Sequence, residues 1–306
     1  MTDDAPLAGR TALVTGSTGG IGAEIARGLA ARGAAVLLHG RDREAGERVR
    51  ESLRDPATGD HALYTADLSE MAAVRNLAAA VRDDHDRLDV LVHNAGTWQG
   101  DRRLVAVPGA DGGVEFTFAV NHLAPYLLTH CLFEAVAASD ADPARIVTVS
   151  SEVHRRGAMD LDAVRGPDGP AGVDAYGLSK LANVMFTYEL ARRLPEGVVA
   201  NACHPGVSPA TDLSRDGSTL AGLGWRLYGL VGGVLGTTDS PAEAAETPLY
   251  LASAPEAAEL NGEYVDDREP VRSSEASYDR AAQRDLWAAS AEMVALTDEE
   301  RAPLST

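Results

Sequence analysis

The sequence predicts an α/β fold in which a doubly wound, mainly seven-stranded parallel sheet carries helices on both faces. Two observations support this prediction. Short apolar runs alternate with longer amphipathic segments along most of the 306 residues, which is the pattern of successive βαβ units. The first apolar run also leads directly into a glycine-rich turn that opens a helical segment. Because crossovers between parallel strands are right-handed, such units wind to both sides of one sheet.

Seven short apolar segments have the pattern of buried strands. They are residues 11–15, 34–38, 61–66, 88–93, 145–150, 198–203 and 262–265. Helical periodicity occupies the intervals between them and the C-terminal part of the chain. The helical segments are residues 21–32, 43–53, 69–84, 113–138, 174–193, 241–252 and 275–296.

Three further segments lack a regular pattern. Residues 152–172 are predicted to be a loop, and residues 297–306 a polar tail. Residues 208–240 are rich in glycine with an apolar middle, which favours either a lid over a pocket or a contact with a partner. No repeat or linker divides the rest, so we predict one Rossmann-type domain over residues 1–296.

Composition excludes several classes of function. A net charge of −19 argues against binding to nucleic acid or to anionic membranes. No run of 18 apolar residues could span a bilayer, and the cytoplasm is the expected location. Cys131 and Cys203 lie in apolar segments and are expected to be reduced thiols. The histidines form no metal-binding spacing, so no metal is expected.

The glycine-rich turn at residues 15–22 reads TGSTGGIG. Gly16 would permit the tight turn, Gly20 the approach of backbone to a pyrophosphate, and Gly22 close packing of helix on strand. The N-terminus of the following helix offers N–H groups to phosphate, and Ser17 and Thr18 add hydroxyl donors. A plain strand-to-helix turn is the alternative, but the preceding strand favours a dinucleotide site.

The end of the second strand bears on the choice of cofactor. NAD sites place an acid there for the ribose hydroxyl, whereas NADP sites place an arginine near the 2′-phosphate. Here Gly40 and Arg41 follow the strand and no acid stands at its end. A guanidinium binds phosphate bidentately, so we predict NADP(H). Asp42 could instead hold Arg41 in a surface ion pair.

Tyr176 and Lys180 form the most distinctive pair in the chain. Lys180 is the only lysine among 27 Lys and Arg residues. Four residues apart on a helix, the two side chains share one face. An ammonium beside a phenol favours the phenolate and lowers the tyrosine pKa, which suits a general acid/base. An ordinary helical pair is the alternative.

Together these motifs resemble the short-chain dehydrogenase/reductase family. The matching residues are the turn at 15–22, Asp67-Leu68, Asn94-Ala95-Gly96, Asn121, Ser151, Tyr176 with Lys180, and Pro205-Gly206. Further segments look like its retinol-dehydrogenase-like, protochlorophyllide-reductase-like branch. They are NHLAPYLLT at 121–129, VSSEVH at 149–154, AYGLSKLANVMFT at 175–187 and EYVDD at 263–267.

The resemblance implies roles for four catalytic residues. Tyr176 would be the general acid/base, and Lys180 would bind the nicotinamide ribose and lower the Tyr176 pKa. Ser151 would hold the substrate oxygen; Ser150 is the adjacent alternative and would face the other side of the strand. Asn121 would hold a relay water, or else cap a bend in its helix.

The resemblance also implies which residues line the cofactor. They are Gly16, Ser17, Thr18, Gly20, Ile21, Arg41, Asp67, Leu68, Asn94, Ala95, Gly96, Tyr176, Lys180, Pro205, Gly206 and Val207. The family usually has Thr or Ser five positions after the proline, where this chain has Ala210. A contact from Thr211 or Ser208 to the nicotinamide is therefore left open. Family members often form homodimers through the helix that bears the tyrosine, and the long loop 152–172 would border the substrate cleft or block that interface.

These features favour an NADPH-dependent oxidoreductase acting on a hydrophobic ketone, aldehyde or secondary alcohol. Apolar residues of the lid indicate a bulky substrate such as a retinoid, steroid or polyketide aromatic, although core or dimer packing would use them equally. They are Leu220, Leu223, Trp225, Leu227 and Tyr228. The alternatives are a non-catalytic NADP(H)-binding protein whose lid docks a partner, and a double-bond reductase or epimerase using the same site.

Overall fold

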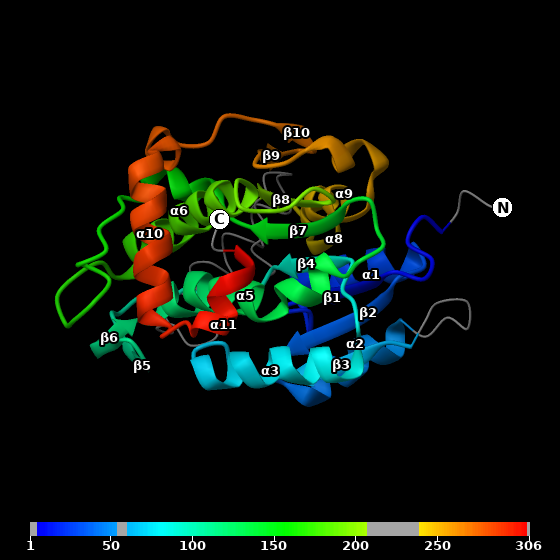
Figure 1. Cartoon of the computed structure of the whole chain (residues 1–306), viewed down its shortest axis with the longest axis horizontal. Coiled ribbons are helices and arrows are strands. Elements are labelled where there is room, and N and C mark those ends of the chain that lie inside the picture. Colours follow the sequence, from blue (N-terminus) through cyan, green and yellow to red (C-terminus); the bar gives the residue numbers. More distant parts are fainter. Residues whose placement is uncertain (1–4, 54–59, 207–238, 305–306) are drawn as a thin grey trace.

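A central eight-stranded sheet organises the computed structural model, which describes residues 5–53, 60–206 and 239–304 (Figure 1). The strand order is β10-β9-β8-β7-β4-β1-β2-β3. Seven strands are parallel, as predicted, and only the short β10 at the edge is antiparallel. The sheet comprises β1 (Thr11–Val14), β2 (Ala35–Gly40), β3 (Ala62–Thr65), β4 (Val90–His93), β7 (Ala144–Val149), β8 (Val198–Cys203), β9 (Tyr264–Asp266) and β10 (Glu269–Pro270).

Helices cover both faces of the sheet and confirm the doubly wound prediction (Figure 1). The helices are α1 (Gly20–Ala31), α2 (Arg43–Ser52), α3 (Met71–Asp84), α4 (Phe116–Phe118), α5 (Ala124–Ala137), α6 (Gly172–Ala191), α8 (Pro241–Ala244), α9 (Glu246–Ser253), α10 (Arg280–Met293) and α11 (Asp298–Arg301). The sheet separates two hydrophobic cores, and successive residues of β1 point to opposite ones. Leu13 belongs to the core with α3, α5 and α6, whereas Val14 belongs to the core with α1 and α9.

The order of the strands creates a crevice beside β1. From β1 the chain winds outward through β2 and β3, and from β4 it winds the other way through β7, β8 and β9. Connections therefore leave β1 and β4 in opposite directions at their carboxyl ends. In open parallel sheets this is the position where ligands bind.

A hairpin replaces the start of the helix predicted at residues 113–138. Strands β5 (Leu104–Val107) and β6 (Ala110–Glu115) pair as a separate two-stranded sheet near the end of α10 (Figure 1). Gly112 and Gly113 both have φ +84, a backbone conformation that a helix excludes. Helix begins only at Phe116, and a π-helical segment η1 (Ala119–Leu123) separates α4 from α5.

The segment predicted to be a polar tail is instead packed on the domain through residue 304. It forms α11 and a 3₁₀ turn, η5 (Ala302–Leu304), and Leu304 is buried. Arg75 Nε donates to Glu300 Oε1 at 2.6 Å, which anchors the segment to α3. The lid predicted at residues 208–240 lies, up to residue 238, outside the described residues.

The helix that bears Tyr176 is covered by this chain's own C-terminal part. Residues 177–190 of α6 are all buried, and α10 packs along them, with Trp287 stacked on Phe186. The part of α6 that contacts α10 is therefore covered within one chain, although the resemblance implied that a homodimer could form through this helix. No helix in the described part of the chain is long and apolar enough to cross a membrane.

The Arg75–Glu300 pair should contribute measurably to stability. Burial raises the pKa of Glu300, but hydrogen bonds from Arg75 oppose this and hold it at about 2. Because these bonds are bidentate and charge-assisted, Glu300→Gln should lower the free energy of unfolding in urea by about 1–2 kcal/mol. The control Glu44→Gln breaks the exposed pair with Arg48 and should change it by less than about 0.5 kcal/mol. Equal effects would contradict the anchoring role.

Buried histidines should make the protein sensitive to acid. Burial lowers the pKa of His93 and His122 to about 3, and that of His39 and His130 to about 4. The unfolded chain binds these protons near pH 6.5, so the free energy of unfolding is greatest above that pH. It should fall by roughly 1.4 kcal/mol per pH unit for each histidine as the pH drops. Urea denaturation between pH 7 and pH 5 measures this, and a flat profile would contradict it.

Candidate active site

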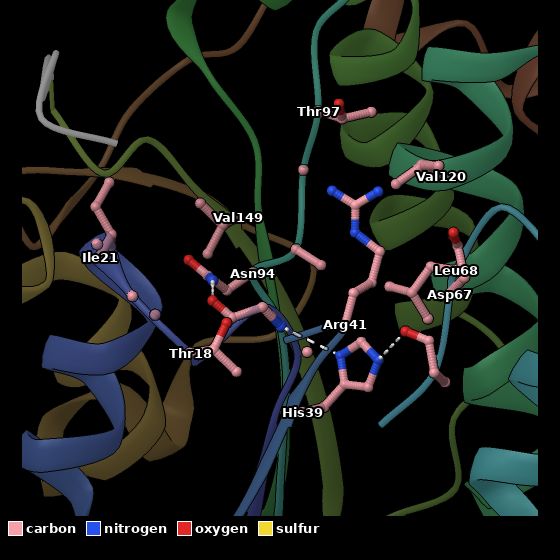
Figure 2. Close-up of a pocket in the computed structure, with 18 of the residues that line it drawn as sticks. Thr18, Ile21, His39, Arg41, Asp67, Leu68, Asn94, Thr97, Val120 and Val149 are labelled. Carbon is pink, nitrogen blue, oxygen red and sulfur yellow. Dashed lines mark hydrogen bonds between the residues drawn. The ribbon is translucent and has the colours of Figure 1, made fainter. Parts of the chain in front are cut away.

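A cavity of about 290 Å³ opens at the carboxyl ends of β1, β2, β4 and β7 (Figure 2). It occupies the crevice that the strand order creates. Most of the residues predicted to bind cofactor line it. They are Gly16, Thr18, Gly20, Ile21, Arg41, Asp67, Leu68, Asn94, Ala95, Gly96, Tyr176, Lys180 and Pro205.

The glycine-rich turn forms one wall of the cavity. Two of its glycines pack so closely against neighbouring backbone that they have no space for a side chain. Gly16 has φ +66, and a Cβ on it would lie 2.8 Å from Ala95 Cα. A Cβ on Gly22 would lie 2.3 Å from the Gly16 carbonyl oxygen. No side chain caps α1 at Gly19. The first N–H groups of α1 therefore border the cavity, an arrangement suited to phosphate.

Asn94 fastens this turn to the end of β4. Its Nδ2 donates to the carbonyl oxygens of Thr15 and Gly16 at 2.9 and 3.2 Å. Thr15 Oγ1 accepts in return from the backbone N–H groups of Asn94 and Ala95, both at 3.1 Å. Asn94 thus both lines the cavity and holds its shape.

His39, which sequence reasoning missed, fastens the other side of the turn (Figure 2). The Gly16 N–H donates to His39 Nδ1, and Nε2 lies 3.3 Å from the Ala66 carbonyl oxygen. These partners require a neutral ring with its proton on Nε2. Burial lowers the pKa of His39 to about 4. The sequence signal that could have revealed this role is a histidine at the end of an apolar strand.

Arg41 extends from the end of β2 into the cavity, toward the side where Leu68 and Val120 lie (Figure 2). Gly40 leaves room for Thr18, because a Cβ there would lie 2.4 Å from Thr18 Cγ2. Asp42 accepts from the Ala45 N–H at 3.0 Å and so caps α2. A guanidinium therefore stands at the position where the sequence predicted recognition of a 2′-phosphate.

Ser17, Gly206 and Val207 are the predicted cofactor residues that are not among those lining the cavity, and Asp67 lines it with a second role. Ser17 is buried and does not line the cavity: its hydroxyl donates to the Val14 carbonyl and accepts from the His39 N–H. The Asp67 carboxylate accepts from the Ser69 N–H at 2.9 Å, so it shapes a turn as well as lining the cavity. Gly206 has φ +82, and Val207 lies outside the described residues, as do Ser208 and Thr211.

Tyr176 and Lys180 reach the cavity from the first turns of α6. Lys180 Nζ donates to the Val149 carbonyl oxygen at 2.9 Å and lies 5.6 Å from the centroid of the Tyr176 ring. The Ser151 side chain lies close enough to that of Tyr176 to lower the tyrosine pKa. Ser150 borders the cavity, but its hydroxyl donates to the Lys180 carbonyl oxygen at 2.9 Å. The serine whose side chain acts on the tyrosine is thus Ser151.

The pKa values of the pair differ from the prediction. Burial raises the pKa of Tyr176 to about 12, although the Ser151 side chain opposes the rise. Burial lowers the pKa of Lys180 to about 8. The expected lowering of the Tyr176 pKa is not found, because both groups are desolvated and the ammonium is bonded to Val149 rather than to the phenol.

The Asn121 side chain joins three parts of the site. Its Oδ1 accepts from the Thr97 N–H at 2.8 Å, and its Nδ2 donates to the Thr97 carbonyl and to Ser179 Oγ, both at 3.0 Å. It lies in the π-helical segment η1 and is buried. Both polar atoms of the side chain are thus engaged, with Thr97 after β4 and with Ser179 on α6, and not with the backbone of its own helix.

Side chains that were not predicted also line the cavity. Among them are Phe116, Thr97, which follows the Asn94–Gly96 motif, and Val120, which precedes Asn121. Among the described residues, no group of three His, Cys, Asp or Glu side chains could hold a metal. Cys131 and Cys203 are free buried thiols.

Known proteins are similar to this chain in sequence or in fold over most of their length. The short chain dehydrogenase family matches residues 10–219. Human retinol dehydrogenase 13 is 34% identical over 95% of this chain and 86% of its own length. The bovine dehydrogenase/reductase SDR family member 13 is 38% identical over 95% of this chain and 75% of its own.

Solved structures agree with these relatives. An uncharacterized protein from Mycobacterium Paratuberculosis has a TM-score of 0.73 at 30% identity, with 96% of both chains covered. The Pseudomonas aeruginosa RhlG/NADP active-site complex has a TM-score of 0.66 at 32% identity, covering 87% of this chain and 98% of that one. The chain therefore belongs to the short-chain dehydrogenase family, in its retinol-dehydrogenase-like branch.

Proposed function

We propose that this chain is an NADP(H)-dependent oxidoreductase that transfers hydride between nicotinamide and a hydrophobic ketone, aldehyde or secondary alcohol. One observation carries the proposal: Tyr176 and Lys180 line the same cavity as the glycine-rich turn and Arg41, and the Ser151 side chain interacts with Tyr176. Relatives named retinol dehydrogenase and the NADP complex of a similar structure support the substrate class and the cofactor.

The cavity suits a dinucleotide phosphate. The cofactor would supply or accept the hydride, and the chain would bind and orient it. Gly16 to Ile21 and the start of α1 would hold the pyrophosphate, Arg41 and Thr18 the 2′-phosphate, and Asp67 and Leu68 the adenine. Asn94 to Gly96, Pro205, Gly206 and Val207 would border the nicotinamide half. The crowding around Gly16 and Gly40 supports this fit: a Cβ there would lie 2.8 Å from Ala95 Cα and 2.4 Å from Thr18 Cγ2, so a side chain would push apart the residues that line the cavity.

Tyr176 would deliver the proton to the substrate oxygen. Its pKa of about 12 keeps the phenol protonated at neutral pH, which is the state that carbonyl reduction requires. Ser151, whose side chain interacts with that of Tyr176, would hold the same oxygen. The Lys180 ammonium, with a pKa of about 8, would bind ribose and stabilise the phenolate left after proton transfer. Thr97, Phe116 and Val120 would contact the apolar part of the substrate.

The proposal also includes the cytoplasm as the location, on the acidic composition and the two reduced cysteines. A non-catalytic NADP(H)-binding protein would not need Tyr176, Lys180 and Ser151 to converge. Double-bond reduction or epimerisation at the same site would show in the identity of the product.

Replacing Tyr176 with Phe tests the proton transfer. Turnover number should fall by about 10²–10⁴-fold because a positioned acid is lost, while NADPH affinity stays within about twofold. NADPH consumption over a panel of hydrophobic ketones and aldehydes, with product analysis, measures the first, and cofactor fluorescence the second. A wild-type turnover number in the Phe variant would contradict the proposed role of Tyr176.

Replacing Arg41 with Gln tests cofactor choice. Loss of charge-assisted bonds to the 2′-phosphate should raise the KM for NADPH by about 10–100-fold and leave that for NADH unchanged. The control Arg43→Gln removes an arginine two positions on, whose Nη2 donates to Thr65 Oγ1, and should preserve the preference. If wild-type enzyme prefers NADH, the assignment of Arg41 is wrong.

A further inference from the structure

His154 controls the backbone of Ser151 although it does not line the cavity. It lies in the 3₁₀ helix η2 (Glu152–Arg156) and is fully buried. Both its backbone N–H and its Nδ1 reach the Ser151 carbonyl oxygen, at 3.0 and 2.8 Å. At the other side of the ring, Nε2 accepts from the Ser274 N–H at 3.0 Å. A carbonyl only accepts and an amide N–H only donates, so the ring is neutral with its proton on Nδ1.

Ser274 belongs to a segment that also grips α6. We call residues 271–278, which follow β10, the C-terminal clasp. The Val271 N–H of the clasp donates to the Tyr264 carbonyl at 2.8 Å, beside the His154 ring, whose centroid lies 4.7 Å from that of Tyr264. Ser273 Oγ lies 2.6 Å from the hydroxyl of Tyr188, which lies on α6. The clasp thus bonds both to η2 and to the helix of Tyr176.

Two glycines bring η2 directly against the first turns of α6. A Cβ on Gly157 would lie 2.5 Å from the Gly177 carbonyl oxygen and 2.8 Å from Leu181 Cβ. Arg155 Nη2 reaches the Arg272 carbonyl of the clasp at 2.7 Å. η2, which begins directly after Ser151, is thus held from both sides, and the Ser151 side chain lies close enough to Tyr176 to lower its pKa.

We infer that His154 is a positioning residue: it links Ser151 to the C-terminal clasp and thereby sets the placement of Ser151 relative to Tyr176. This inference rests on the proposed function, in which Ser151 holds the substrate oxygen. Simple core packing is the alternative, and it would require only an aromatic ring on Tyr264. Phe retains that ring but neither hydrogen bond, so it separates the two explanations.

Three substitutions at His154 test the link. His154→Phe should lower the turnover number with NADPH and a hydrophobic ketone by about 10–100-fold, with NADPH affinity within about twofold of wild type. His154→Asn places an amide N–H near Nδ1, and His154→Gln places an amide oxygen near Nε2. Each should recover part of the lost turnover. The control His130→Phe removes another buried ring, whose Nδ1 lies 2.9 Å from the Tyr126 carbonyl oxygen; it should lower the melting temperature but leave turnover unchanged.

Amide hydrogen exchange separates this inference from the proposed function. In His154→Phe, exchange should rise at least about tenfold both in η2 and at Ser274, whether or not any carbonyl is reduced. If the wild type consumes no NADPH with any ketone or aldehyde, the proposed function fails. An increase in exchange in both η2 and Ser274 of the Phe variant would still support the link between Ser151 and the C-terminal clasp. A folded Phe variant with wild-type turnover would overturn the inference. An increase in amide exchange in the C-terminal clasp without an increase in η2 would also overturn it.

Discussion

Two reciprocal hydrogen bonds between β7 and α6 hold the candidate active site together. Lys180 Nζ donates to the Val149 carbonyl, and Ser150 Oγ donates to the Lys180 carbonyl. All four groups are buried, where a lost hydrogen bond costs most. A guanidinium would need several acceptors in one plane, whereas an ammonium on a slim stem needs few. This constraint explains why a chain whose other basic residues among 27 Lys and Arg are all arginine has a lysine at position 180.

Burial also determines the protonation states around that contact. Desolvation disfavours the charged form of each group, so it raises the pKa of Tyr176 and lowers that of Lys180. The sequence suggested only the attraction between ammonium and phenolate, which acts in the opposite direction on the tyrosine. At neutral pH the phenol is therefore protonated, which is the form that the proposed proton donation to a carbonyl needs.

Much of the fold and of the cofactor site could be predicted because its signals are local. The spacing of Gly16, Gly20 and Gly22 after an apolar strand is visible in one short stretch, and so is the i, i+4 pair on α6. The residues that sequence reasoning missed act through partners distant in the chain. His39 binds Ala66, and His154 binds Ser274, 120 positions away. Hydrophobic periodicity contains no information about such pairs, nor about the positive φ angles of Gly112 and Gly113 that replace the predicted helix with a hairpin.

The C-terminal third of the chain connects these observations. Helix α10 covers the α6 face that would otherwise be open to a second subunit, and the Arg75–Glu300 pair anchors the last helical turn to α3. The clasp between them bonds to α6 through Ser273 and to the Ser151 loop through His154. Residues that follow the last parallel strand therefore hold both sides of the Ser151–Tyr176 contact. A homodimer, if this chain forms one, must use a surface other than the buried face of α6, because the chain already supplies the helix that packs there.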